Sequence, residues 1–119
     1  MATFEDARRI ALSLPETSEG SLSGTPGFRV RKQAFARLRP EGDVLVVWVA
    51  DEGEKEALLT TQPDIYFTLP HYDGHSSVLV HLPAIPVDEL QEVLTEAWRV
   101  RAPRRLLAEF DASRKAPAE

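Results

Sequence analysis

Cysteine is absent from the 119-residue sequence, and its absence excludes several classes of protein. Without thiols the chain cannot form disulfides, ligate zinc through cysteine or use a thiolate nucleophile. Long apolar runs are missing too: residues 44–50 form the longest one and are far too short to span a membrane. The N-terminal segment carries Glu5, Asp6, Arg8 and Arg9, so it does not have the apolar run of a secretory signal. We therefore expect a soluble, cytoplasmic protein with no membrane partner.

Motifs that fix a chemistry are also lacking. There is no Gly-x-x-x-x-Gly-Lys phosphate loop, no Gly-x-Ser-x-Gly nucleophile elbow and no dinucleotide fingerprint. Ser21, Ser23 and Thr25 have no histidine near them in sequence to act as a base. These absences predict a non-enzymatic protein that needs no cofactor.

Charge is unevenly distributed along a chain whose net charge is −5. Residues 20–40 carry five basic side chains and no acidic one, and residues 99–115 carry six basic and two acidic ones. The rest of the chain has three basic and seventeen acidic residues. Two basic segments within an acidic protein are the strongest functional signal in the composition.

Apolar spacing predicts the element order α-β-β-β-α-β-β-α-α. A capping box at Thr3 and Asp6 starts a helix over Phe4–Leu14, which Pro15 ends. Residues 15–27 contain three glycines and two prolines, so an irregular loop is expected there. Asp51 caps a short helix with Ala57, Leu58 and Leu59 on its inner side, and further helices start at Val87 and Pro103.

Five segments have the composition of strands: Phe28–Lys32, Phe35–Arg39, Val44–Val49, Ile65–Leu69 and Ser77–Leu82. The continuously apolar Val44–Val49 is typical of a strand covered on both faces, hence a central one. We predict an α+β fold, an antiparallel sheet of about five strands with helices packed mainly on one face. It forms a single domain over residues 1–119, ordered over about 3–112, with a frayed C-terminal tail.

Several motifs occur in an order that resembles the MmcQ/YjbR family. They are Gly24-Thr-Pro-Gly-Phe-Arg-Val30, Phe35-Ala-Arg-Leu38, Phe67-Thr-Leu-Pro-His-Tyr-Asp-Gly74, Glu96-Ala-Trp-Arg99 and Ala102-Pro-Arg-Arg-Leu106. The likeness covers Phe4 to about Ala112, and Leu69 stands where the family often has Thr. It implies a small α+β fold and a DNA-binding function, and it carries over no catalytic residues.

The resemblance and the basic strands together predict low-specificity binding to double-stranded DNA. Phosphates would be contacted by Arg29, Arg31, Lys32, Arg37 and Arg39, assisted by Arg104 and Arg105 at the start of the last helix. The other interpretation of these strands is a solvated sheet face whose cations pair with the many acids. A second alternative is a protein-interaction module that meets a basic partner.

Histidines suggest a third alternative, a small-molecule or metal site at His71, Tyr72, Asp73 and His75. His71, Asp73 and His75 would share a face in extended chain, and imidazole and carboxylate are transition-metal ligands. Asp73-Gly74 is also a turn signal, and a turn would separate these side chains. We therefore expect no metal, and structural roles for His71 and Tyr72. Trp48 and Trp98 occupy apolar positions and are expected to pack in the core.

Overall fold

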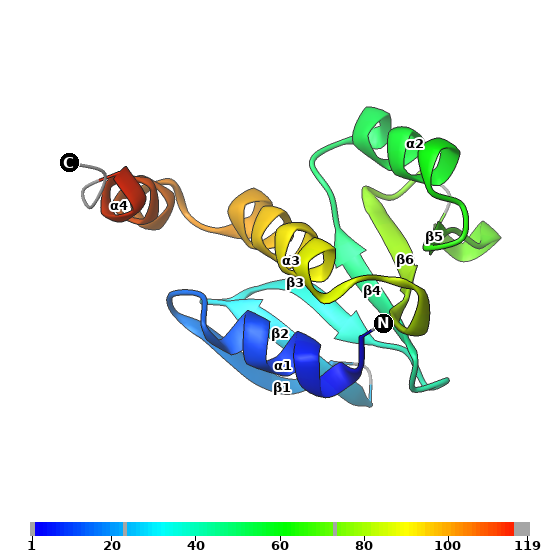
Figure 1. Cartoon of the computed structure of the whole chain (residues 1–119). Coiled ribbons are helices and arrows are strands. Elements are labelled where there is room, and N and C mark those ends of the chain that lie inside the picture. The colour runs from blue at the N-terminus through cyan, green and yellow to red at the C-terminus, as the bar shows by residue number, and fades with distance from the viewer. Residues whose placement is uncertain (1, 23, 73, 116–119) are drawn as a thin grey trace.

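The protein is an antiparallel sheet with helices laid on it (Figure 1). The computed structural model describes residues 2–22, 24–72 and 74–115. In chain order its elements are α1 (Phe4–Leu12), β1 (Thr17–Leu22), β2 (Thr25–Val30), β3 (Gln33–Leu38), β4 (Val44–Trp48), α2 (Glu52–Thr61), β5 (Tyr66–Phe67), the 3-10 turn η1 (Pro70–Tyr72), β6 (Ser77–His81), the 3-10 turn η2 (Leu82–Ala84), α3 (Val87–Arg101) and α4 (Arg104–Lys115). The strand order is β1-β2-β3-β4-β6-β5, so the α+β prediction is confirmed, with six described strands rather than about five.

The loop predicted over residues 15–27 is wrong, because most of it forms the hairpin of β1 and β2. The strands pair in register from Thr17 opposite Val30 to Leu22 opposite Thr25. Pro26 is tolerated because β3 begins to pair with β2 only at Gly27, so no ladder partner on that side needs its missing N–H. A Cβ at Gly27 would lie 2.2 Å from Leu22 Cδ1, so glycine allows a close approach here.

One face of the sheet, here called the inner face, carries the main core. Phe28, Val30, Leu45 and Val47 are fully buried on it, beneath α1 and α3 (Figure 1). Trp98 of α3 is also fully buried, and its Nε1 donates to the Pro15 carbonyl at 3.0 Å. The expected core role of Trp98 and the placement of helices mainly on one face are confirmed.

The opposite, outer face has only a small apolar cluster. Val44, Val46, Leu79 and Tyr72 are buried there, and Trp48 and Phe67 pack against them partly exposed. Because β4 contributes to both clusters, it is the central strand covered on both sides that its apolar run predicts. Tyr72 of η1 is the member of this cluster that does not come from a strand.

The cap of α2 is as predicted, and Leu58 and Leu59 pack partly buried against the main core, but Ala57 does not lie on the buried side. Asp51 Oδ1 accepts a hydrogen bond from the Glu54 amide at 2.8 Å. Ala57 is exposed, whereas Lys55 is only 4% exposed. The Lys55 ammonium donates to the carbonyls of Tyr72 at 2.7 Å and His75 at 2.9 Å. The spacing of apolar residues along the helix does not predict a buried lysine, because Lys55 is buried by its hydrogen bonds to a loop.

Two other boundaries differ from the sequence pattern. The strand expected over Ile65–Leu69 is reduced to Tyr66–Phe67, since η1 begins at Pro70. Helix α4 continues to Lys115, so the first part of the expected frayed tail is helical, and residues 116–119 lie outside the described part. Within the described residues, every helix is too short or too polar to cross a lipid bilayer.

Replacing Lys55 with Met should destabilise the fold. The change keeps the side-chain length but leaves two carbonyls without their charged donor, at a cost of about 1–3 kcal/mol. For a domain of this size that corresponds to a fall in Tm of several degrees, measurable by circular dichroism. Lys32→Met, at an exposed turn position, is the control and should change stability by no more than about 0.5 kcal/mol. Equal stability of the two variants would contradict the structural role of Lys55.

Candidate nucleic-acid interface

Three of the predicted arginines point outward from neighbouring strands. Arg37 of β3 lies opposite Val46 of β4, whose side chain belongs to the outer cluster. The Arg39 amide donates to the Val44 carbonyl at 2.9 Å, which continues the alternation one step further. Arg29 lies between two fully buried residues of β2, so its side chain points away from the core. Strand alternation therefore gathers these cations on the outer face.

The described strands place no carboxylate on this face. Glu19 is the one acidic residue in the described strands, and it pairs with Arg8 of α1 at 2.7 Å, on the inner side. The outward neighbours in β1 and β2 are small, since Gly20 pairs with Gly27. A Cβ at Gly20 would stand 3.8 Å from Arg29 Nη1, so this guanidinium lies over bare backbone. The surface around Arg29 is open to a ligand.

Tyr72 fixes the positions of two of these cations. Its phenolic oxygen accepts a hydrogen bond from Arg37 Nη2 and another from Arg39 Nη1, both at 2.9 Å. The Arg39 guanidinium also lies 5.8 Å from the centre of the Tyr72 ring. Tyr72 itself is 6% exposed. Two like charges thus share one neutral acceptor, and a guanidinium has five N–H donors, so both retain donors for an anion.

In the described part of the chain, a carboxylate partly compensates the positive charge of Arg39, but none compensates that of Arg37. Glu41 accepts a hydrogen bond from Arg39 Nε at 3.1 Å. This bond, followed by the one to Tyr72, raises the pKa of Arg39, so the group stays cationic. The Glu41 carboxylate is half exposed, and pairs of this kind are weak and easily exchanged for another anion. Within the described residues, Arg37 has no carboxylate partner.

Arg101 joins this face from the end of α3. Its Nε donates to the Ala34 carbonyl at 2.9 Å and its Nη2 to Gln33 Oε1 at 2.8 Å. The guanidinium lies 5.5 Å from the centre of the Trp48 ring. Together with Arg37, both residues border a hollow of about 440 Å³ on the outer face, whose other lining residues are Val46, His71, Tyr72, His75, Ser76 and Ser77.

Neither Arg101 nor Trp48 was predicted for this surface. The sequence explains Arg101 as a cation favoured at a helix C-terminus, and Trp48 as a core residue. Trp48 is partly exposed, so the core expectation is only half right. The alternation of β4 contains the missing signal, because Trp48 follows Val44 and Val46 on the outward side. The contact of Arg101 with Trp48 joins residues far apart in sequence, so no local sequence pattern predicts it.

Arg31 and Lys32 do not join the outer-face cluster. Strand β2 ends at Val30, two residues before the end of the predicted strand, and both residues form the turn before β3. Arg31 has φ of 54° and is paired with Glu16, its Nε lying 2.6 Å from Oε1. This carboxylate raises the pKa of Arg31 and compensates its charge. Lys32 is exposed in the same turn.

Arg104 and Arg105 lie in the first turn of α4 and are exposed. Figure 1 shows α4 beyond the end of α3, apart from β4 and β6. Neither side chain makes a hydrogen bond or ion pair within the described residues. A ligand that spans the outer face would have to extend past the end of α3 to reach them.

The residues of the histidine alternative border the same hollow as Arg37. His71 lies edge-on to Tyr72, with ring centres 5.0 Å apart, and His75 follows in the loop that Lys55 holds. Asp73 lies outside the described residues. In the part of the chain that is described, no three histidine or carboxylate side chains are grouped as metal ligands. The hollow combines imidazoles with guanidiniums, which suits an anion.

This chain is similar in sequence to a known protein family and in fold to a solved structure. A family model described as YjbR matches residues 12–100. Uncharacterized proteins of Mycobacterium bovis and Mycobacterium tuberculosis are 38% identical over 130 residues, covering 95% of this chain and 98% of each relative. The crystal structure of Deinococcus radiodurans protein DR2400, with a domain described as DUF419, superposes with a TM-score of 0.71 at 23% identity. That match covers 84% of this chain and 78% of the other, and it extends to the fold alone.

The shared hydrogen bonds at Tyr72 should appear as a measurable coupling. Tyr72→Phe removes the acceptor for two cations and should cost about 1–2 kcal/mol in the free energy of unfolding. In a double-mutant cycle with Arg37→Gln, the coupling should be about 0.5–1 kcal/mol by urea denaturation. The pair Tyr72→Phe and Arg9→Gln is the control and should be additive, because Arg9 lies on α1. Additivity in both cycles would show that the Tyr72 contacts do not hold the arginines.

Proposed function

We propose that this chain, which belongs to the YjbR family as its motifs predict, binds the phosphate backbone of double-stranded DNA through the outer face of its sheet. Binding involves no chemical step and little sequence preference. The observation that carries the proposal is the convergence of Arg29, Arg37 and Arg39, with Arg101, on a face whose strands present no carboxylate. A DNA ligand also agrees with the cytoplasmic location expected from the sequence.

The positions of the guanidiniums favour phosphate contacts over base contacts. Arg37 and Arg39 are tied to Tyr72, and Arg101 to the backbone of β3, so all three remain close to the sheet surface. Groups held in this way meet the outermost atoms of a duplex, which are phosphate oxygens, and cannot extend into a groove to read base edges. Low sequence specificity follows from this short reach.

Net charge does not oppose this binding strongly. The acidic residues lie mainly on the helices and turns, whereas Arg29, Arg37, Arg39 and Arg101 lie on the outer face. At physiological ionic strength the Debye length is about 8 Å, so carboxylates on the far side of the sheet are largely screened from a bound phosphate. Affinity should nevertheless be modest, in the micromolar range or weaker, as is usual for non-specific DNA binding.

Salt dependence tests the proposal directly. Four phosphate contacts predict a slope of about −3 to −4 in a plot of log K against log salt concentration. Affinity for a short labelled duplex, measured by fluorescence polarization, should then fall on the order of 100-fold between about 50 and 200 mM salt. Binding that does not change over this range would reject the proposal, as would the absence of binding at about 1 mM protein.

Single arginine variants locate the contact surface. Arg29→Gln should reduce the slope by about one unit and weaken binding several-fold, because one phosphate contact is lost. Arg9→Gln changes the net charge equally on α1 and should leave the slope unchanged. Arg31→Gln should behave like the control, since Glu16 already compensates that charge. Equal losses in all three variants would indicate general attraction rather than an outer-face site.

A further inference from the structure

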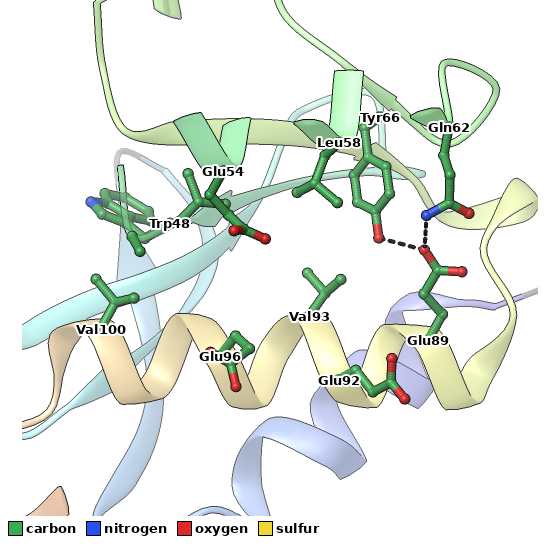
Figure 2. A pocket seen from close by; sticks show the side chains of 12 residues that line it. Trp48, Glu54, Leu58, Gln62, Tyr66, Glu89, Glu92, Val93, Glu96 and Val100 are labelled. Atoms are coloured by element: carbon green, nitrogen blue, oxygen red, sulfur yellow. Dashed lines mark hydrogen bonds between the residues drawn. The ribbon is translucent and has the colours of Figure 1, made fainter. Parts of the chain in front are cut away.

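A second surface of opposite charge lies between α2 and α3. It is a groove of about 450 Å³, with Trp48 and Val100 at one end and Tyr66, Gln62 and Glu89 at the other (Figure 2). Helix α2 and the end of β4 form one wall, and α3 forms the other. The groove adjoins the outer-face hollow, because Trp48 lines both, but none of the arginines proposed to bind phosphate lines the groove.

The floor of the groove is apolar and reachable from solvent. Val93 and Val100 project from one side of α3, seven residues apart, and Leu58 faces them from α2. Leu58, Val93 and Trp48 are half-buried, and Val100 is 40% exposed, an unusual value for a large aliphatic side chain in this protein. These side chains leave apolar surface in water that a partner could cover.

The rim of the groove is acidic. Glu54 extends from α2, and Glu89, Glu92 and Glu96 follow one another along α3; the lining residues include no basic side chain. Glu89 to Glu96 spans seven residues, about 10 Å along the helix axis. Within the described residues, the Glu54 and Glu92 side chains make no hydrogen bond or ion pair, and Glu96 only approaches Arg99 at 3.8 Å.

One end of the rim is rigid. Glu89 Oε2 accepts hydrogen bonds from Tyr66 Oη at 2.8 Å and Gln62 Nε2 at 2.7 Å. Burial, and then the Glu89 carboxylate, raise the pKa of Tyr66, so the phenol remains a donor at neutral pH. Two hydrogen-bond donors thereby hold the Glu89 carboxylate at a fixed position. A cationic group that binds at this end of the groove therefore meets a carboxylate whose position is already fixed.

We infer that this groove docks an amphipathic basic helix of a partner protein. Apolar side chains on such a helix, at positions i, i+4 and i+7, would cover Leu58, Val93 and Val100, while flanking lysines or arginines would meet the carboxylates of both walls. Charge complementarity selects a basic partner and repels DNA. The apolar floor selects a segment with hydrophobic anchors over a small, fully hydrated cation.

A designed peptide tests this inference. The probe is a fluorescein-labelled helical peptide of about 15 residues with leucines at those positions and lysines beside them, read by fluorescence polarization. We expect saturable binding with a micromolar Kd. The same peptide with serines for the leucines should bind about tenfold more weakly, and one with glutamates for the lysines should not bind.

Protein variants separate the groove from general charge attraction. Glu92→Gln/Glu96→Gln should weaken peptide binding about tenfold. The matched control Glu52→Gln/Glu109→Gln changes the net charge equally at exposed positions on α2 and α4 that do not line the groove, and should leave Kd within about twofold.

Three results would overturn the inference: no saturation at about 1 mM peptide, equal weakening in both double variants, or full competition by spermidine with no effect of removing the leucines. The last result would identify a small-cation site. DNA binding by the outer face is measured separately and does not depend on any of these outcomes.

Discussion

The hydrogen bonds made by Lys55 are the constraint on which the outer face depends. Its buried ammonium holds the carbonyls of Tyr72 and His75, and so fixes the loop that follows β5 against the body of α2. Tyr72 is thereby pressed onto the small apolar cluster of the outer face, with its hydroxyl directed at Arg37 and Arg39. A cation buried on one side of the loop therefore positions two partly exposed cations on the other.

Charge separation in this protein follows from secondary structure. In the strands, alternation sends the arginines outward and the apolar residues inward, and Glu19 turns inward to Arg8. In α3, helical periodicity buries Leu90, Leu94 and Trp98 and leaves Glu89, Glu92 and Glu96 on the opposite side. A molecule of net charge −5 can therefore present a cationic sheet face and an acidic groove at once.

Local patterns in the sequence predict the elements whose causes are local. The capping box of α1, the Asp51 cap of α2, the apolar β4 and the amphipathic α3 all have the predicted position and type. The hairpin of β1 and β2 does not follow from local pattern, because glycine and proline usually interrupt regular structure. Their effect depends on the partner strand: Gly20 faces Gly27, and Pro26 precedes the stretch that pairs with β3.

The candidate site was predictable to the extent that strand alternation determines it. The outward positions of Arg29, Arg37 and Arg39 follow from the two-residue period of a strand. Arg31 does not share that position, because β2 ends at Val30, two residues before the end of the predicted strand. The contacts of Lys55 with Tyr72 and of Arg101 with Trp48 join positions 17 and 53 residues apart, respectively. Such contacts are set by tertiary packing, and single-sequence periodicity contains no information about them.

Family likeness and fold leave the function to be argued from surface residues. The inner positions of the strands are occupied by side chains that the core requires, and a related protein at 23% identity reaches the same fold. Outward positions have no such requirement, because a serine or threonine at position 29 would satisfy the sheet equally well. Arginine there, beside two further arginines that share one neutral acceptor, adds like-charge repulsion without adding packing. Under the proposed function, a bound polyanion that neutralises all of them at once would supply the interaction that the isolated fold lacks.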